Sequence, residues 1–551
     1  MAKQLKIAFL GGVGEIGKNM TAVEYGDNIF IIDCGSMFPT NETPGIDLVI
    51  PDFNYIIKNK DKVRAILLTH GHEDHIGGMP YLLKELPDVK VYGSKLTLAL
   101  LEHKLSEAKI TMPKCVCVQG GSKEKIGVFS VEFIKQSHSI SGAFALAITT
   151  PIGVIFHTGD FKIDYTPIDS ERADLSRFAR LGDDGVLLML GESTNIEKNG
   201  YSMSESAVGT TIDKLFANNL DSRIIIATFA SNVHRLQQII NICEKFGRKV
   251  VFNGRSMLKV SELAKQIGEL NYKQGTVIET EEMNKYPNKK ICIISTGSQG
   301  EPMSALTRMA NGEDKIIVGK NDVIILSSSP IPGNEKYVYT TINNLYQRGA
   351  KVIYGSLDEL HVSGHACKEE LKLMLSLIRP KFFIPVHGEY RHLKQHEELA
   401  MSLGIPQKNI GICEIGSQIE IKKTKLSPCE NVVAGSVYVD GLMDVDDIVL
   451  RDRTQLSKDG FVVCLLGISL ESNSLASTPD IIARGLQFTD DILEEIKEAI
   501  CKMFEGFSYH GSSDRGSLKA SVRRIINNII KARLKQRPMI LPIIMEIWFV
   551  E

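Results

Sequence analysis

Residues Ile66–Gly78 read ILLTHGHEDHIGG, and this stretch decides the fold. An apolar, β-prone run is followed by four potential metal ligands, His70, His72, Asp74 and His75. Alternating positions after a strand place His70 and His72 on one side of a tight loop. Asp74 and His75 then fall at the start of the next helix, where they can face a second metal. Imidazole and carboxylate ligands suit zinc or manganese. An exposed polar loop is the alternative, but the chain has only 13 histidines, so chance clustering is not expected.

Three later residues are candidates for completing a two-metal site. They are His138 in KQSHSISGA, Asp160 in FHTGDFK and His387 in FIPVHGEYRH. Each follows an apolar, β-like run and lies beside glycine or another small residue. A lone histidine is more often a hydrogen-bonded structural residue, but the order and setting of these three favour ligands.

A glycine pattern near the N-terminus raises the question of a dinucleotide cofactor. Residues 9–25 read FLGGVGEIGKNMTAVEY, which contains Gly12-x-Gly14-x-x-Gly17, and Asp33 closes the next apolar run. A dinucleotide site needs these glycines to open a helix, because the pyrophosphate binds the amides of the helix N-terminus. The residues that follow are β-prone and contain a turn signal at 26–28. The sequence therefore predicts close backbone packing or a turn between strands.

The bulk composition describes an ordinary globular chain. At 551 residues it is too long for one core, so we expect two to four domains. A net charge of −2 gives no global attraction to nucleic acid. We find no apolar run of bilayer-spanning length and no signal peptide, so we expect no membrane association. The ten cysteines are scattered without a CxxC motif, which favours reduced thiols in the cytoplasm.

The secondary-structure pattern changes along the chain. Residues 1–190 read as strand-rich with few helices. Residues 205–355 alternate strands such as RIIIATF with helical runs such as HRLQQIINICEKFG, which predicts a parallel, helix-flanked sheet. A helix, a strand and a second helix follow over 356–425. Residues 455–551 hold a hairpin-like start, an acidic helix, a basic helix and the strand PMILPIIMEIW.

The ligand pattern resembles that of the metallo-β-lactamase superfamily. HxHxDH is followed by a later histidine, an aspartate in TGD and a distant histidine. About 225 residues separate Asp160 from His387, a span that can hold a whole domain. This span is similar to the β-CASP insertion of nucleases, with Glu192 in GESTN, His365 in HVSGH and His387 in PVHGE as its markers. Over nearly its full length, the chain resembles bacterial ribonuclease J.

The resemblance implies an α/β protein of three parts. The first is a metallo-β-lactamase αββα sandwich over 1–204, completed by 356–454. The second is an inserted β-CASP parallel-sheet domain over 205–355, and the third is a small C-terminal α/β dimerisation domain over 455–551. The glycine stretch would then belong to the first hairpin of the sandwich and not to a cofactor site.

The resemblance also assigns the metals and the chemistry. His70, His72 and His138 would hold one Zn²⁺ or Mn²⁺ ion. Asp74, His75 and His387 would hold the other, and Asp160 would bridge the two. The catalytic residues would be His365, acting near the leaving oxygen, with Asp74 and Glu192. Glu192 would orient a metal-bound histidine, and its alternative is a surface carboxylate. A structural Ca²⁺ would be tied to Asp47 and Asp440.

Two segments are candidates for holding RNA with a 5′-monophosphate end. One begins the helix after RIIIATF, with Ser231, Asn232 and Val233; plain N-capping by Ser231 or Asn232 is the alternative. The other is the HVSGH stretch, comprising His361, Val362, Ser363, Gly364 and His365. For His361, a packing or loop role is the alternative.

The function implied is a metal-dependent ribonuclease with 5′-to-3′ exonuclease and endonuclease activity. A hydroxide shared by the two metals would attack the phosphodiester of single-stranded RNA. Roles in mRNA decay and rRNA maturation, a homodimer or tetramer, and RNA-degradation or ribosome partners are further expectations. A small-molecule hydrolase is disfavoured by the large insertion and HVSGH. An idle RNA-binding scaffold is disfavoured because all seven ligands are present.

Overall fold

The structure is a computed structural model, and the chain forms two compact units. The first comprises Met1–Met37 with Val49–Val437, and the second comprises Phe38–Leu48 with Tyr438–Glu551. The residues that the structure describes are 3–39, 43–168, 172–301, 303–328, 330, 334–354, 360–441, 443–511 and 513–547.

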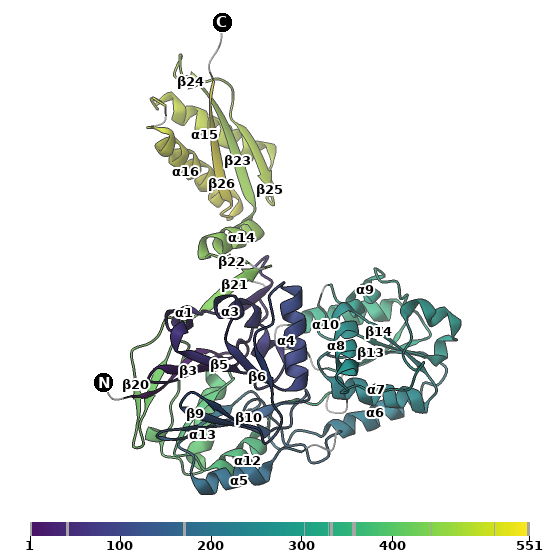
Figure 1. The fold of residues 1–551 in the computed structure, drawn as a ribbon. Coiled ribbons are helices and arrows are strands. Elements are labelled where there is room, and N and C mark those ends of the chain that lie inside the picture. The colour runs from purple at the N-terminus through teal and green to yellow at the C-terminus, as the bar shows by residue number, and fades with distance from the viewer. Residues whose placement is uncertain are drawn as a thin grey trace. The chain divides into compact units, whose positions relative to one another are not determined.

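Eight strands of the described chain form the first sheet of the first unit, in the order β20-β19-β1-β2-β3-β5-β6-β7 (Figure 1). The strands β1, β2 and β3 are antiparallel, whereas β3, β5, β6 and β7 run parallel. The strands are β1 Leu5–Gly11, β2 Met20–Tyr25, β3 Asn28–Ile32, β5 Val63–Leu67, β6 Lys90–Gly93, β7 Cys115–Cys117, β19 Gln418–Ile421 and β20 Leu426–Pro428.

A second sheet of six strands has the order β18-β12-β11-β10-β9-β8. Its strands β8 to β11 are antiparallel, and β11, β12 and β18 are parallel. The last strand, β18, therefore joins β12 although the chain between them is long. The strands are β8 Lys123–Ile126, β9 Phe129–Lys135, β10 Phe144–Thr150, β11 Gly153–His157, β12 Leu188–Glu192 and β18 Phe382–Val386.

The two sheets pack face to face, and helices cover the outer faces (Figure 1). Apolar side chains of both sheets, such as Phe9, Phe30, Phe133 and Leu188, share one buried cluster. A second cluster joins the other face of the six-stranded sheet to α5, α12 and α13. The predicted αββα sandwich is confirmed. The helices are α1 Asn54–Lys58, α2 Glu73–Ile76, α3 Met79–Glu85, α4 Lys95–Glu107, α5 Leu175–Asp184, α12 Lys368–Ile378 and α13 Tyr390–Ser402.

The N-terminal glycine stretch lies between two antiparallel strands, as predicted. It connects β1 to β2, and no helix follows it. Gly12 has a φ of 76°, and a Cβ atom there would lie 2.2 Å from Oδ1 of Asn19. Glycine is needed here because the backbone is left-handed and closely packed.

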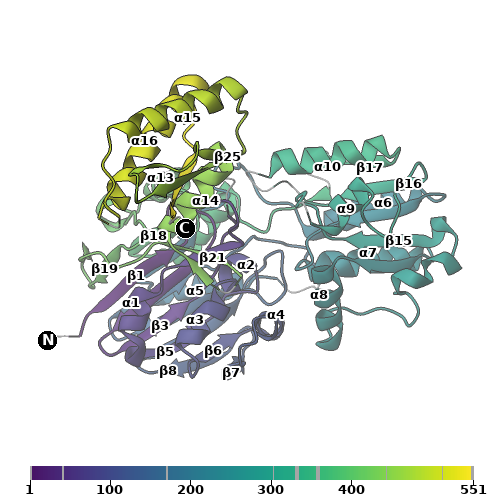
Figure 2. The same ribbon diagram turned by 90° about the horizontal axis from the view of Figure 1, so that it is seen from above.

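Residues 223–353 contain a five-stranded parallel sheet in the order β14-β15-β13-β16-β17. Helices α6 and α7 lie on one side of it, and α9 and α10 on the other (Figures 1 and 2). The predicted alternation of strands and helices is confirmed. The elements are α6 Glu205–Ala217, β13 Arg223–Ala227, α7 Val233–Lys245, β14 Lys249–Asn253, α8 Arg255–Gln266, β15 Ile291–Ser295, α9 Ala305–Asn311, β16 Asp322–Leu326, α10 Glu335–Gln347 and β17 Lys351–Ile353.

In the second unit, β23 pairs with β24 and β25 antiparallel and with β26 parallel. Helices α15 and α16 bury one face of this sheet. The predicted hairpin start, acidic helix, basic helix and final strand are all found. The elements are β21 Ser436–Asp440, β22 Met443–Val445, α14 Asp447–Asp459, β23 Phe461–Ser469, β24 Ser474–Leu475, β25 Asp480–Arg484, α15 Asp490–Glu505, α16 Arg515–Leu534 and β26 Met539–Ile547.

Two further observations concern the sequence predictions. Residues 438–454 fall in the second compact unit, ahead of the boundary expected at 455; the boundary itself stays a prediction. Among the described helices, none is long and apolar enough to cross a bilayer.

Candidate metal centre

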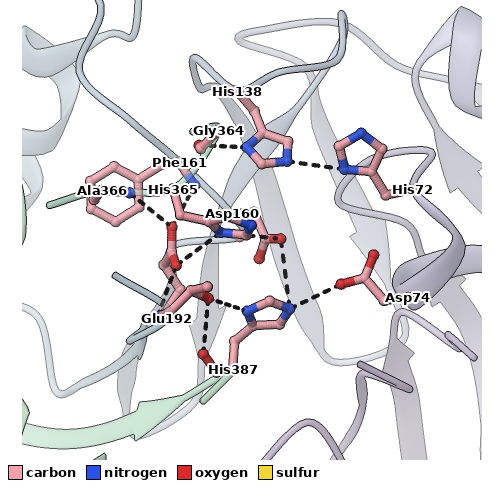
Figure 3. Close-up of polar contacts among 12 residues, drawn as sticks. His72, Asp74, His138, Asp160, Phe161, Glu192, Gly364, His365, Ala366 and His387 are labelled. Atoms are coloured by element: carbon pink, nitrogen blue, oxygen red, sulfur yellow. Dashed lines mark hydrogen bonds and ion pairs between the residues drawn. The ribbon is translucent and has the colours of Figure 1, made fainter. Parts of the chain in front are cut away.

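The candidate ligands lie where strands of both sheets end. The loop after β5 carries His70 and His72, and the loops after β9 and β11 carry His138 and Asp160. The strand β18 is followed at once by His387. Neighbouring strand ends meet at one edge of a sandwich, so residues far apart in sequence converge there (Figure 3). As predicted, α2 holds Asp74 and His75 in its first turns.

Three imidazoles form the first group of the centre. Nδ1 of His72 lies 3.1 Å from Nε2 of His70 and 3.1 Å from Nε2 of His138. The other ring nitrogen of His138 donates to the carbonyl oxygen of Gly364 at 2.7 Å. That bond fixes the ring so that Nε2, with its lone pair, faces the other two histidines.

The first group suits a cation. Burial lowers the pKa of His72 to about 4, and burial with neighbouring histidines lowers the pKa of His70 and His138 as well. Neutral imidazoles that converge in this way repel one another through their lone pairs unless a cation or a shared proton lies between them. Buried neutral histidines are the usual ligands of zinc.

The second group combines carboxylates with imidazoles. Nε2 of His387 lies 3.1 Å from Oδ2 of Asp74, and Nε2 of His75 lies 3.1 Å from Oδ2 of Asp160. Burial alone would lower the pKa of His75, but Asp160, Asp74 and Asp33 raise it well above its usual value. These four side chains place their ligand atoms within 4.8 Å of one another, which fits one metal ion.

Asp160 lies between the two groups. Its Oδ2 atom is 3.1 Å from His75, 3.7 Å from His387 and 3.8 Å from Nε2 of His70. Burial would raise the pKa of this carboxyl, but His387 and His75 hold it well below its usual range. A carboxylate with a lowered pKa in this position can reduce the repulsion between two neighbouring cations.

Several supporting residues were not predicted from the sequence. Asp33 binds Nδ1 of His75 at 2.8 Å and accepts the Thr69 backbone N–H at 2.8 Å. Thr194 Oγ1 lies 2.6 Å from Nδ1 of His387. Asp33 directly follows an apolar run, and His70 and Asp160 follow theirs within a few residues. This position after a strand is the sequence feature that could have identified Asp33.

The carboxylate of Glu192 orients His365. Its Oε2 atom lies 3.1 Å from Nδ1 of His365, and Oε1 accepts the backbone N–H of Phe161 at 3.0 Å (Figure 3). Burial would lower the pKa of His365, but Glu192 and Asp160 raise it to about 9. Glu192 is buried, so the alternative of a surface carboxylate is wrong. The histidine that it contacts is His365, which is not among the expected metal ligands.

The HVSGH segment closes over the first group of ligands. A Cβ atom on Gly364 would lie 2.6 Å from Cε1 of His138, so a larger residue could not pack there. Ser363 Oγ accepts a hydrogen bond from Asn195 at 2.6 Å, and the Val362 side chain is buried. His361 is partly buried, and burial with the nearby Arg235 lowers its pKa to about 4.

The start of α7 plays a structural part. Asn232 caps the helix by accepting the N–H of Arg235 at 3.0 Å, and Val233 is buried. Ser231 is half-buried. Arg235 also donates to the carbonyl oxygen of Leu360 at 3.1 Å, which brings this helix end next to HVSGH. The capping alternative therefore holds for Asn232, while phosphate binding stays a prediction.

Asp47 and Asp440 lie close together in the second unit. Oδ2 of Asp47 accepts the N–H of Gly441 at 2.8 Å, and the Asp440 carboxylate pairs with Arg453 at 2.7 Å. Arg453 also donates to the carbonyl oxygen of Gly45. The Asp440 carboxylate is therefore paired in this structure, and the structural Ca²⁺ expected at Asp47 and Asp440 stays a prediction.

Comparisons with known proteins agree with this geometry. Four family models match successive parts of the chain: the metallo-beta-lactamase superfamily over 13–163, ribonuclease J, beta-CASP domain over 221–345, Zn-dependent metallo-hydrolase RNA specificity domain over 351–409, and ribonuclease J C-terminal domain over 448–547. A protein from Bacillus subtilis (strain 168), ribonuclease J2, is 39% identical over 99% of both chains. The chain belongs to the ribonuclease J family.

Other ribonuclease J proteins are similarly related. One from Mycolicibacterium smegmatis is 40% identical, with 98% of this chain and 97% of the relative covered. One from Helicobacter pylori (strain ATCC 700392 / 26695) is 39% identical over 98% of this chain and 79% of the relative. A crystal structure of a protein of unknown function from Enterococcus faecalis V583 has a TM-score of 0.54 at 19% identity, covers 76% of this chain and 100% of its own, and shows the fold alone.

Membership of the ribonuclease J family agrees with the centre described above. The family model described as Zn-dependent spans 351–409, which includes HVSGH and His387. The clustered histidines and aspartates suit metal ions.

Proposed function

We propose that the protein is a metal-dependent ribonuclease that acts on single-stranded RNA as a 5′-to-3′ exonuclease and as an endonuclease. The observation that carries this proposal is the position of Asp160, whose single oxygen Oδ2 lies within 4 Å of His70, His75 and His387. One anion shared by two ligand groups is what a two-metal phosphodiesterase requires. Family membership supplies the RNA substrate.

In this proposal, His70, His72 and His138 hold one Zn²⁺ or Mn²⁺ ion, and Asp74, His75 and His387 hold the other. Two such ions would activate water and neutralise the phosphodiester charge. Asp160 keeps the two ligand groups at a fixed separation by contacting both.

His365 is the proton donor of the proposal. With Glu192 holding its pKa at about 9, the imidazole carries a proton at neutral pH that it can give to the leaving oxygen. Asp74 is the other catalytic residue of the proposal, as a metal ligand beside His365. Burial would raise the pKa of the Asp74 carboxyl, but His75 and His387 lower it and keep the carboxylate charged.

Recognition of the RNA end is assigned to HVSGH and the start of α7. Ser363, His361 and the amides near Ser231 would face a 5′-monophosphate, and a triphosphate would be too bulky. The contact of Arg235 with Leu360 supports this, because it joins the two segments.

The activity is tested by incubating the protein with Mn²⁺ or Zn²⁺ and 5′-end-labelled RNA that carries either a monophosphate or a triphosphate. Mononucleotides from the monophosphate end, together with internal cuts, are expected. Equal exonuclease rates on both ends would remove the phosphate pocket from the proposal. Hydrolysis of a lactone, with RNA left intact, would favour a small-molecule hydrolase instead.

A homodimer, which can pair further into a tetramer, is proposed to form through the second unit. The side of the C-terminal sheet away from α15 and α16 exposes Leu541, Ile543 and Met545 at 41%, 44% and 49%. These alternate with the buried Ile540 and Ile544. An apolar sheet face of this kind favours association.

Sedimentation of the full chain tests the assembly. Ile543→Glu should shift a dimer to a monomer, because a buried charge would oppose association. Lys531→Glu, on α16, is the matched control and should leave the dimer unchanged. A stable Ile543→Glu dimer would place the interface elsewhere.

The cellular setting is proposed from the sequence. Roles in mRNA decay and rRNA maturation, and association with RNA-degradation or ribosomal proteins, are proposed from family membership. A cytoplasmic location is proposed because the ten cysteines form no disulfide. A structural Ca²⁺ bound through Asp47 and Asp440 is proposed as well, with Arg453 as the residue it would displace from Asp440.

A further inference from the structure

A second buried carboxylate lies beyond Glu192, at the start of α12. Glu370 is fully buried and accepts four hydrogen bonds. Its Oε1 atom accepts from the Ile163 N–H and the Ser202 hydroxyl, both at 2.7 Å. Its Oε2 atom accepts from the Ser202 N–H at 2.7 Å and the Cys367 N–H at 2.8 Å. Four short bonds to one carboxylate make a rigid junction.

The donors belong to three segments that carry proposed site residues. Ile163 lies three residues after Asp160, and Cys367 lies two residues after His365. Ser202 belongs to the segment that follows Glu192. Glu370 therefore joins the chain segments that carry Asp160, Glu192 and His365. It touches none of those three side chains.

Glu192 and Glu370 divide the amides of two loops between them. Glu192 accepts the N–H groups of Phe161 at 3.0 Å and of Ala366 at 3.4 Å (Figure 3). Glu370 accepts the N–H groups of Ile163 and Cys367, which lie further along the same two loops. Each loop is thus held once by Glu192 and once by Glu370. The second pair of bonds, to Ile163 and Cys367, depends on Glu370 alone.

Helix capping alone does not account for Glu370. A capping glutamate at the third helical position binds the backbone N–H of the N-cap residue, here Cys367. The bonds from Ile163 and from both donor groups of Ser202 come from outside the helix. They would be unnecessary if the only task were to start α12.

We propose that Glu370 is a positioning residue, which fixes the separation between the Asp160 loop and the His365 loop. This inference rests on the proposed function, because it takes Asp160 as the shared ligand and His365 as the proton donor. Glutamine at this position would turn an N–H₂ group toward backbone N–H groups. The amide N–H₂ and the backbone N–H groups would repel each other, because both are donors. The Asp160 loop, the His365 loop or both would then move away.

The test compares Glu370→Gln, Glu370→Ala and the milder Ser202→Ala with the wild-type protein. We expect Glu370→Gln to lower kcat on 5′-monophosphorylated RNA by about 10- to 100-fold at saturating RNA and Mn²⁺. The Mn²⁺ concentration for half-maximal activity should rise by about tenfold. Ser202→Ala removes one of the four donors to Glu370, so kcat should fall by about threefold. The variant should fold as the wild-type protein does.

The matched control is Asp174→Ala, which removes a helix cap from α5 but no bond to the site loops. It should leave kcat and the Mn²⁺ requirement unchanged. If Glu370→Gln lost activity only in proportion to its loss of folded protein, with an unchanged Mn²⁺ requirement, the inference would be overturned. An inactive wild-type protein would instead refute the proposed function.

Discussion

Two buried polar clusters of the first unit differ in how their charges are balanced. In one, Lys162 lies 3.5 Å from Asp164 and 3.6 Å from Glu205, and Arg235 lies 2.6 Å from Glu205. Two cations face two anions, so this network is neutral by itself. In the metal centre, the nitrogens of His70, His75 and His387 converge on the single carboxylate of Asp160, with no lysine or arginine among the described residues that pair with it.

The difference separates a structural cluster from a functional one. The charges of the Lys162 network balance one another, and the network ties α6 and α7 to the loop after β11. The metal centre instead gathers histidine nitrogens and carboxylate oxygens within 4.8 Å of one another, so we expect it to gain stability from added cations. The predictions below test whether the two clusters are independent, from the largest effect to the smallest.

Removing the shared charge of the metal centre should have the largest effect. Asp160→Asn keeps the shape of the side chain but leaves two cations without their common anion. We expect metal to be lost from both groups and RNA cleavage to fall on the order of 10⁴-fold, as for one member of a catalytic unit. Metal analysis and initial rates measure this, and an Asp160→Asn protein with two metals and full activity would contradict the two-metal assignment.

Breaking the neutral network should affect stability and not metal. Arg235→Met leaves Glu205 buried without its closest partner, at a cost of about 3–5 kcal/mol in unfolding free energy. Urea unfolding measures this cost, and metal content should stay at the wild-type level. If the folded variant lost metal, the two clusters would be coupled and the comparison would fail.

Weakening a support of the metal centre should have a smaller effect than removing a ligand. Asp33→Asn would disturb the bond to Nδ1 of His75, so we expect a loss of about 10- to 100-fold in activity. Asp52→Asn is the control, because Asp52 accepts a turn N–H from Asn54 and touches no ligand. Equal rates for both variants would show that His75 needs no support.

Acid should narrow the stability difference between wild type and Arg235→Met. Burial would raise the pKa of Glu205, but Arg235 and Lys162 lower it to about 2. A carboxyl with a lowered pKa stabilises the fold fully above its ordinary value of 4.5, and this contribution is lost as the pH falls toward 2. Urea unfolding at pH 6 and pH 3 should show the narrowing; a constant difference would mean that Arg235 does not set this ionisation.

The parts of the molecule that could be predicted from sequence are those with a local signal. The cluster from His70 to His75 lies in one stretch, and His138 and His387 each follow a strand. Asp33 also follows a strand, but nothing near it in the sequence shows that it supports His75. Glu370 gave no local signal, because its importance comes from partners far away in sequence. For Asn232 the sequence allowed either helix capping or phosphate binding. Only the hydrogen bond from the Arg235 N–H shows that it caps α7.

The order of the ligands along the chain has a consequence for protein synthesis. β18 pairs with β12, so His387 reaches the centre only after the five-stranded sheet that lies between β12 and β18 in the sequence has been made. At about 5–20 residues per second, the roughly 225 residues after Asp160 take on the order of ten seconds or more to translate. During that time a growing chain holds most of its ligands but not a complete centre, so it cannot cut the message from which it is being translated.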